Sequence, residues 1–339
     1  MLPCDGDGTA RTQEGADPAV STSGDGRSVS PTERSNSRPA EGSREASRTI
    51  SDKRSVIDFV LRNRILQVLA AVLIVWALPP WYGSAPSWNA ALSILLAGFG
   101  LYQLNRVFDV VEDEINDPNA YARTSAVKAV LRTVAISAIL ASLCLSIVLT
   151  NYLATATLSI MILIGVLYSV PFLKREQGES RRLKQIASLK NAIPSVVWPF
   201  TTILYPAMSS SGVRLLQLLL AIIALSCGIF TIEVAWDVRD MRGDQVAGIS
   251  TLATAFGVHR ALLVPLVASC VQALVITLLV YFGNLATLWL LPALLLVLLP
   301  AVAYLWKDSL ASNRDRSHLL VLINISAVIP LGLAGRWAA

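Results

Sequence analysis

Nine long apolar runs, separated by short polar segments, constrain this chain more than any other feature. Hydrophobic residues make up 54% of the 339 residues and the mean hydropathy is +0.58, although the first fifty residues are almost entirely polar. Each run is close to or above the ~20 residues that a helix needs to cross about 30 Å of hydrocarbon. The runs cover about Ile65–Trp81, Trp88–Val111, Val127–Leu149, Leu153–Val170, Ala187–Pro206, Val213–Trp236, Val258–Phe282, Leu285–Trp306 and Leu319–Trp337. We therefore predict an all-α polytopic membrane protein, a nine-helix transmembrane bundle in the lipid bilayer.

The segment before the first run has a different composition. Residues 1–54 are rich in Gly, Ser, Pro, Asp, Glu and Arg and contain few large apolar residues. Such a segment cannot bury enough apolar surface to offset its chain entropy, so we expect a disordered polar tail. It also lacks the apolar core of a secretory leader. Residues 55–339 are expected to form one transmembrane domain.

Positive charge alternates between successive loops. The loops after the even-numbered runs carry most of the Lys and Arg residues, and the loops after the odd-numbered runs carry almost none. The most basic loop follows the fourth run and contains Lys174, Arg175, Arg181, Arg182, Lys184 and Lys190. The positive-inside rule then predicts a cytoplasmic amino terminus, cytoplasmic even-numbered loops and an outer carboxyl terminus. Only Arg336 opposes this pattern. The net charge of +5 is modest, and we expect no nucleic-acid partner.

Two clusters of acidic residues follow apolar runs on the predicted cytoplasmic side. Asn105, Asp109 and Asp113 recur every four residues, a spacing that places them along one face of a helix. The second cluster, Asp237, Asp240 and Asp244, follows the sixth run. Carboxylates beside a membrane span are costly unless they meet a cation, a cavity or water. Both clusters and the most basic loop are therefore expected to meet on one face of the membrane.

This combination of charges is suited to a metal-bound anion. Carboxylate oxygens are ligands that Mg²⁺ prefers, and Mg²⁺ commonly completes its coordination with phosphate oxygens. Nearby lysine and arginine side chains could neutralise the remaining phosphate charge. Beside an apolar bundle, a diphosphate site implies an isoprenoid diphosphate. The alternative is structural: solvated acids at a helix end, paired with Arg106 or Arg123. The two histidines and four scattered cysteines do not favour a zinc centre.

These motifs resemble those of the UbiA superfamily of intramembrane prenyltransferases. The first family motif, NxxxDxxxD, and the second, DxxxD, are matched by Asn105, Asp109 and Asp113 and by Asp240 and Asp244, with Asp237 one turn before the second motif. Further matches are the segments Leu167–Pro171, Lys190–Asn191 and Gly248–Leu252. The resemblance covers about residues 60–337, with the motifs in the family order. Both aspartate motifs together, with a basic segment between them, are far more specific than either alone.

The resemblance implies a mechanism and a set of site residues. Asp109 and Asp113 would hold one Mg²⁺ ion, Asp240 and Asp244 would hold another, and Asn105 would support the first metal or a phosphate oxygen. The residues expected to bind the diphosphate are Lys174, Arg175, Lys184 and Lys190. Departure of the diphosphate leaves an allylic carbocation, which aromatic groups would shield from water until an acceptor attacks. Candidates for that aromatic wall are Tyr102, Phe108, Tyr168 and Trp236.

The chain departs from the family pattern at two places. Many relatives have Asn-Asp at the start of the first motif, whereas this chain has Asn105 followed by Arg106. Lys174 also lies six residues beyond Tyr168, a wider spacing than the YxxxK of relatives. Three functions remain open at this point. They are a prenyltransferase acting on an aromatic, quinone-precursor, tetrapyrrole or lipid acceptor, a terpene cyclase on the same scaffold, and a transporter.

Overall fold

The computed structural model describes residues 65–116, 118–174, 180–186, 189–283, 298 and 300–310. The chain divides into two units, Met1–Ile50 and Ser51–Ala339, and every described residue belongs to the second. The predicted polar tail, the predicted ninth run and Arg175 therefore lie outside the described residues, as does most of the predicted eighth run.

The described part is all-α apart from one two-residue ladder, which confirms the predicted fold class. Its elements are α2 (Ile65–Ala77), η1 (Pro79–Tyr82), α3 (Trp88–Phe108), α4 (Val110–Asn116), α5 (Pro118–Ala126), α6 (Lys128–Leu149), α7 (Tyr152–Ser169), β1 (Leu173–Lys174), β2 (Ser180–Arg181), η2 (Leu183–Gln185), α8 (Leu189–Pro199), η3 (Phe200–Leu204), α9 (Tyr205–Met208), α10 (Leu215–Val246), α11 (Leu252–Gly283) and α13 (Lys307–Leu310). The antiparallel strands β1 and β2 pair Leu173 with Arg181.

Five described helices are long and apolar enough to cross a membrane, namely α3, α6, α7, α10 and α11. Helix α2 is apolar but only 13 residues long. The predicted fifth span is broken into α8, η3 and α9, because Pro194, Pro199 and Pro206 remove backbone donors and a π-helical turn separates the two α-helices. The multi-pass membrane fold is thus confirmed, and the count of nine spans stays a prediction.

Two predicted boundaries were wrong, and both errors bear on the acidic clusters. Helix α3 ends at Phe108, so Asp109 stands at a break between α3 and α4 and the first motif does not follow one continuous helix face. Helix α10 instead continues through Val246, so the second cluster lies on its last turns and not in a loop. At the end of α3, the Arg182 guanidinium donates to the Phe108 carbonyl oxygen, which satisfies this backbone acceptor where the chain turns.

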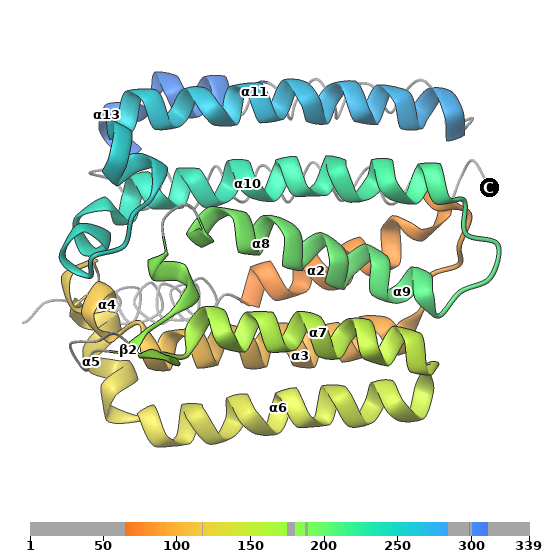
Figure 1. The fold of residues 1–339 in the computed structure, drawn as a ribbon, viewed down its shortest axis with the longest axis horizontal. Helices are drawn as coiled ribbons and strands as arrows, with labels where there is room; N and C mark the ends of the chain where they lie inside the picture. The colour runs from red at the N-terminus through yellow and green to blue at the C-terminus, as the bar shows by residue number, and fades with distance from the viewer. Residues whose placement is uncertain are drawn as a thin grey trace, which may run out of the picture. The chain divides into compact units, whose positions relative to one another are not determined.

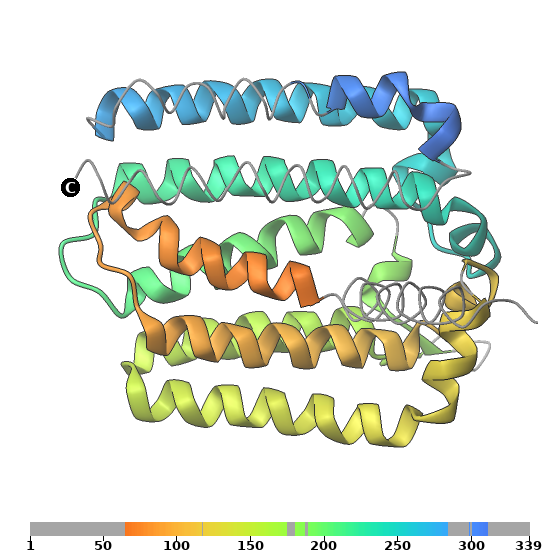
Figure 2. The same cartoon turned by 180° about the vertical axis from the view of Figure 1, so that it is seen from behind.

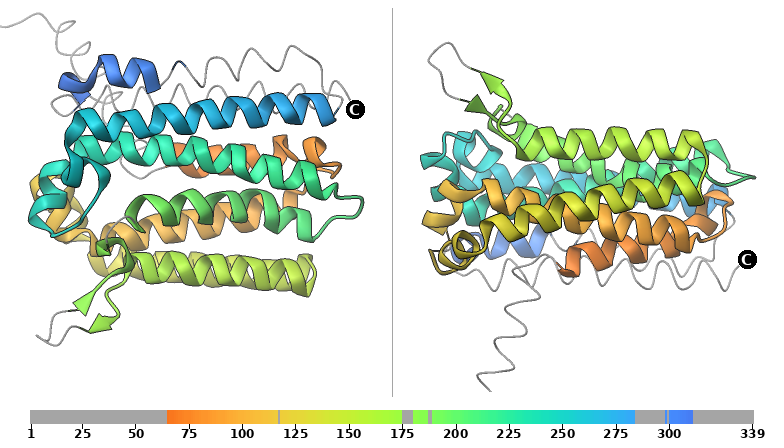
Figure 3. Two further views of the ribbon diagram at one scale, coloured as in Figure 1. Left: turned by 45° about the horizontal axis from the view of Figure 1, so that its top comes forward. Right: turned by 90° about the horizontal axis from the view of Figure 1, so that it is seen from below.

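The long helices lie side by side (Figure 1). Helix α10 packs against α11 and α8, and α3 packs against α2, α6 and α7. The views in Figures 2 and 3 show α4, α5 and the start of α11 at one end, where α3 and α10 finish and α8 begins. Both acidic clusters and the basic segment between α7 and α8 therefore share one end of the bundle, as the sequence predicts.

Two groups of buried apolar residues form the core of the described part. One joins α10 and α11 around residues such as Val234 and Leu279, and the other joins α2, α3, α6 and α7 around Ile94 and Leu158. Outward-facing apolar residues remain exposed, including Val148 at 76%. Exposed apolar surface of this extent fits a lipid environment better than water.

Helices α3 and α6 approach each other closely at Gly100. A Cβ atom at this position would lie 2.7 Å from Ile139 Cγ1 and 2.8 Å from the Ala135 carbonyl oxygen. The buried Ser142 hydroxyl also donates to the Ser93 carbonyl oxygen at 2.6 Å across the same interface. Small residues that allow such contact are typical of packing between membrane helices.

We predict that Gly100→Ala destabilises the protein. The gain in helix propensity is at most ~1 kcal/mol, whereas overpacking against a backbone oxygen costs about 1–3 kcal/mol. Gly165→Ala is the matched control, because the atoms nearest to its added Cβ belong to the flexible Leu101 side chain and not to backbone. Thermal unfolding in detergent should show a lower midpoint for Gly100→Ala than for Gly165→Ala. The opposite order would contradict this account of the interface.

Candidate active site

A cavity of about 210 Å³ opens between α3, α4, α7, α8 and α10. Its charged and amide lining consists of Asn105, Arg106, Asp109, Glu112, Asp113, Asn116, Lys184, Lys190, Glu233, Asp237, Arg239, Asp240 and Asp244. The structure therefore brings together all six predicted acidic and amide residues and two of the four predicted diphosphate-binding residues. Lys174 lies in β1, and Arg175 lies outside the described residues.

The first acidic cluster forms around Asp109. Its carboxylate accepts hydrogen bonds from Arg182 Nη1 at 2.9 Å and from Asn105 Nδ2 at 2.5 Å, and it also contacts Lys184 Nζ. The Glu112 Oε1 atom lies 2.8 Å from both Arg182 Nη2 and Lys184 Nζ. Two carboxylates from the α3–α4 break thus bind two cations from the segment between α7 and α8.

Arg182 has a further role in shaping this cluster. Its Nη1 atom donates to the carbonyl oxygen of Phe108 at 2.9 Å, which satisfies a backbone acceptor at the end of α3. Glu112 lies in the first turn of α4, where a carboxylate is favoured by the helix dipole. Burial alone would raise the pKa of Glu112, but the charges of Lys184 and Arg182 outweigh burial and lower that pKa below its usual value.

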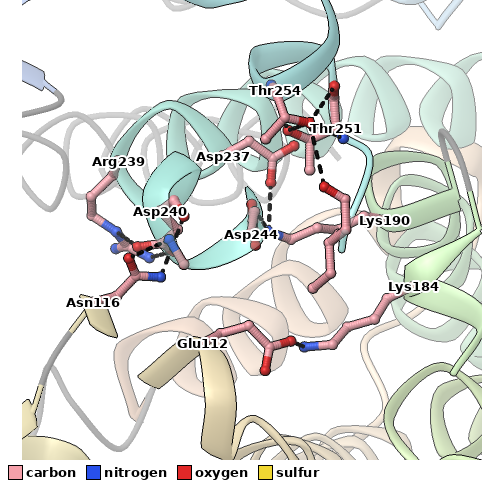
Figure 4. Close-up of polar contacts among 12 residues, drawn as sticks. Glu112, Asn116, Lys184, Lys190, Asp237, Arg239, Asp240, Asp244, Thr251 and Thr254 are labelled. Atoms are coloured by element: carbon pink, nitrogen blue, oxygen red, sulfur yellow. Dashed lines mark hydrogen bonds and ion pairs between the residues drawn. The ribbon is translucent and has the colours of Figure 1, made fainter. Parts of the chain in front are cut away.

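The second acidic cluster forms around Lys190 (Figure 4). Lys190 Nζ lies 2.5 Å from Asp244 Oδ2 and 3.0 Å from Asp237 Oδ1. Asn191 Nδ2 also donates to Asp237 Oδ2 at 2.6 Å. Asp237 and Asp244 are each only 1% exposed, so their charges depend on these partners. Because Asp237 and Asp244 are seven residues apart on α10, they lie on the same side of the helix.

Asn116 connects α4 to α10 between the two clusters. Its Nδ2 atom donates to the Asp240 carbonyl oxygen at 3.3 Å, and its Oδ1 atom accepts from the Gly243 backbone N–H at 3.1 Å. A Cβ atom at position 243 would overlap the Asn116 amide, which accounts for the glycine. The Asp240 carboxylate is paired with Arg239 from the same helix (Figure 4). The two acidic motifs are thereby held side by side.

The donor atoms of the cavity fit a hard divalent cation. Its carboxylate and amide oxygens are of the kind that Mg²⁺ prefers. Asn105 Oδ1 is buried without a hydrogen-bond partner among the described residues, so an amide oxygen is available beside Asp109. No ready-made group of three or more His, Cys, Asp or Glu ligands occurs in that part of the chain. Lysine and arginine side chains instead neutralise the carboxylates.

The other end of the cavity is apolar. It is lined by Ala97, Gly98, Leu101, Tyr102, Ile162, Gly165, Ile193, Pro194, Val197 and Trp198. The rings of Tyr102 and Trp198 are stacked, with centroids 5.4 Å apart. Tyr168 and Trp236, two further residues of the expected aromatic wall, also line the cavity, whereas Phe108 packs against the core.

Sequence reasoning gave no site role to four residues that the structure brings into or beside this site. Glu112 and Glu233 line the cavity, and Arg182 and Asn191 bind its carboxylates. Glu233 could have been found, because a carboxylate inside an apolar run is a signal of function. Arg182 carried no such signal among six basic residues. Arg106, where the chain departs from many relatives, lines the cavity and donates from Nη2 to Thr124 Oγ1 at 2.9 Å.

Solved structures of UbiA homologues share this fold. An apo structure from Aeropyrum pernix K1 aligns with a TM-score of 0.58 and 19% identity, over 81% of this chain and 98% of that one. A structure from Archaeoglobus fulgidus, bound to GPP and Mg²⁺, aligns with a TM-score of 0.58 and 16% identity, over 82% and 99%. A digeranylgeranylglyceryl phosphate synthase aligns with a TM-score of 0.56 and 13% identity, over 83% and 99%.

Sequence similarity identifies the family directly. None of the curated proteins matches this chain. The sequence does match the UbiA prenyltransferase family over residues 55–326, which is most of the chain and includes both aspartate motifs. With its membrane-spanning helices and its cavity of paired carboxylates and cations, the chain belongs to the UbiA prenyltransferase family and is an intramembrane prenyltransferase.

Proposed function

We propose that the cavity binds an isoprenoid diphosphate with Mg²⁺ and transfers its prenyl group to an aromatic, quinone-precursor or lipid acceptor. The observation that carries this proposal is the division of one cavity into a charged end and an apolar end. A diphosphate suits the first and a prenyl chain suits the second. Related structures from Archaeoglobus fulgidus were solved with GPP and Mg²⁺ and with DMAPP and Mg²⁺.

Two pairs of aspartates would hold the metal ions. Asp109 and Asp113 form one pair and Asp240 and Asp244 the other, and Asn105 supplies a buried amide oxygen beside the first. When bound, Mg²⁺ would neutralise the diphosphate and favour its departure. A further homologue was solved with Cd²⁺, which supports a divalent-cation site in this fold. We favour Mg²⁺ because all the donors are oxygen atoms.

The chain's own cations complete the diphosphate site. Lys184 lines the cavity from η2 and Lys190 lines it from the first turn of α8, and each already contacts a carboxylate of an aspartate motif. They can turn toward phosphate oxygens when a metal occupies those carboxylates. Lys174 and Arg175 remain proposed diphosphate contacts from the segment between α7 and α8. At the apolar end, Tyr102 and Trp198 exclude water from the carbocation.

The fate of the carbocation separates the two remaining functions. In a transferase an electron-rich acceptor attacks it, and in a cyclase a double bond of the same prenyl chain does so. We favour transfer because the chain belongs to a family of prenyltransferases, which also argues against a transporter. A lipid acceptor has a precedent in the fold, since one solved relative is a digeranylgeranylglyceryl phosphate synthase.

We also propose an orientation in the membrane. The charged end of the bundle carries the basic segment between α7 and α8, and basic loops favour the cytoplasm. The amino terminus and the active site would then be cytoplasmic and the carboxyl terminus would lie outside. The diphosphate substrate would enter from the aqueous side that holds the charged cavity lining.

We predict that Asp109→Asn and Asp244→Asn each reduce Mg²⁺-dependent diphosphate release by at least about 100-fold, because each removes a metal ligand and its charge. Membranes containing each variant are incubated with GPP and a panel of phenolic and glycerolipid acceptors, and released diphosphate is measured before and after EDTA treatment and Mg²⁺ addition. Glu114→Gln is the matched control, since Glu114 is exposed on α4. Near-normal release by both aspartate variants would contradict the metal site.

We predict that prenyl product forms only when an acceptor is present. Purified membranes are incubated with labelled geranyl, farnesyl or geranylgeranyl diphosphate, with and without a panel of phenolic and glycerolipid acceptors, and products are separated by chromatography. Labelled adducts that require the acceptor support transfer. A cyclic hydrocarbon formed without any acceptor would establish the cyclase instead.

We predict that Trp198→Ala shifts substrate preference toward longer prenyl diphosphates. Trp198 lies eight residues beyond Lys190, or about 12 Å along a helix, and it lies against α3 at Gly98. Removing its ring lengthens the apolar end of the cavity. The ratio of kcat/KM for a longer chain over a shorter one should rise at least about tenfold. Trp88→Ala, at an exposed residue, is the control, and an unchanged ratio in Trp198→Ala would refute this assignment.

A further inference from the structure

Two lysines in the cavity are held in the same way. Each contacts one carboxylate of an aspartate motif and also a second carboxylate outside the expected metal pairs. Figure 4 shows Lys184 beside Glu112, and Lys190 beside Asp237 and Asp244. Lys184 bridges Asp109 and Glu112, and Lys190 bridges Asp244 and Asp237. Lys184 lies in η2, just before α8, and Lys190 lies in the first turn of α8. The arrangement occurs once in each acidic cluster.

The first bridge is deeply buried. Glu112 is 5% exposed and Lys184 is 3% exposed. The ammonium and carboxylate are 2.8 Å apart, and Arg182 makes a parallel bridge by contacting both Asp109 and Glu112. Glu112 therefore touches both cations that also contact the first metal-motif carboxylate.

In the second bridge a lysine likewise contacts two carboxylates, both from α10. Lys190 lies between Asp237 and Asp244, whose carboxylates face it from two turns of α10. Asp237 is held in place by the Asn191 amide at 2.6 Å. Asp237 thus has a partner outside the metal motif, whereas Glu112 shares both of its cations with Asp109.

Metal binding at Asp109 or Asp244 would take a carboxylate partner away from Lys184 or Lys190, and the second carboxylate would keep that lysine paired. A cation that takes the oxygens of Asp109 or Asp244 removes one partner from each lysine, and a buried ammonium without a partner is strongly disfavoured. A lysine has a long flexible stem and would otherwise swing away. A second carboxylate keeps the ammonium at the cavity wall, where a phosphate oxygen can replace the lost partner.

From this geometry we infer that Glu112 and Asp237 are equivalent positioning residues, which hold Lys184 and Lys190 for the diphosphate and do not bind the metal. The same contacts assign Arg182 as a further diphosphate-binding cation beside Lys184. This inference rests on the proposed function and specifies it, because it divides the acidic residues into metal ligands and lysine anchors. It also gives Asp237 a role distinct from that of the proposed metal ligands Asp240 and Asp244, next to which it lies in sequence.

The test measures binding of inorganic pyrophosphate with Mg²⁺ to the full-length protein in detergent, by isothermal titration calorimetry. Glu112→Gln and Asp237→Asn preserve side-chain size and should each weaken pyrophosphate binding about tenfold or more, the loss expected for a charged hydrogen bond. Glu114→Gln should bind as the wild type does. Adding Lys184→Gln to Glu112→Gln, or Lys190→Gln to Asp237→Asn, should cost far less than the product of the single losses. Fully multiplicative losses in both pairs would overturn the inference.

A second measurement separates anchors from metal ligands. Mn²⁺ binding without pyrophosphate, followed by electron paramagnetic resonance, should survive in Glu112→Gln and Asp237→Asn and be lost in Asp109→Asn and Asp244→Asn. Loss of Mn²⁺ from Asp237→Asn would make Asp237 a ligand and overturn its assignment. Thermal unfolding shows whether each variant is folded. If Glu112→Gln or Asp237→Asn does not fold, the charge-preserving Glu112→Asp or Asp237→Glu takes its place. Each replacement should lose less pyrophosphate affinity than Lys184→Gln or Lys190→Gln, respectively.

Pyrophosphate binding distinguishes failure of the proposed function from failure of the anchoring role. If the wild type binds no pyrophosphate with Mg²⁺, the proposed function itself is wrong. If the wild type binds it and both Glu112→Gln and Asp237→Asn bind it equally well, the proposed function stands and the anchoring role is wrong.

Discussion

Neutralisation of buried carboxylates by lysine and arginine is the interaction on which this structure depends. Asp237 and Asp244 are almost fully buried at the end of an apolar helix, where unpaired charge is strongly disfavoured. Their partner, Lys190, comes from the start of α8, and Asp109 receives its cations from the segment just before it. These pairings fasten the ends of α3, α4, α8 and α10 together and so define the charged end of the cavity.

The direction of the helices explains why one end of the cavity is charged and the other end is apolar. Helices α3, α7 and α10 finish at the charged end, and α8 begins there (Figure 1). Residues one or two turns further into the bundle, such as Leu101 and Val197, belong to the apolar interior of the membrane-spanning part. A prenyl diphosphate has the same division between charge and hydrocarbon. The match between the proposed substrate and the cavity thus follows from where each helix crosses the boundary between membrane and water.

Much of this site could be predicted from residue spacing, and particular failures show the limit of that reasoning. The motif residues Asn105, Asp109 and Asp113 do share a cavity, but the helix breaks at Asp109 because Arg182 satisfies the Phe108 carbonyl oxygen. That contact joins residues 74 positions apart in the sequence. The fifth predicted run is helical where it is described, but its prolines and a π-helical turn divide it into shorter elements.

The sequence by itself determined the class of the protein: apolar runs of membrane-spanning length, alternating loop charge and two aspartate motifs are local patterns that survive without coordinates. Tertiary structure alone decided which cation neutralises which carboxylate. Lys184 meets Asp109 across 75 residues and Lys190 meets Asp244 across 54, and the roles of Glu112 and Arg182 emerge only from those contacts. The physical reason is that burial strongly favours pairing of every charge, whereas the choice of partner depends on how separate helices pack.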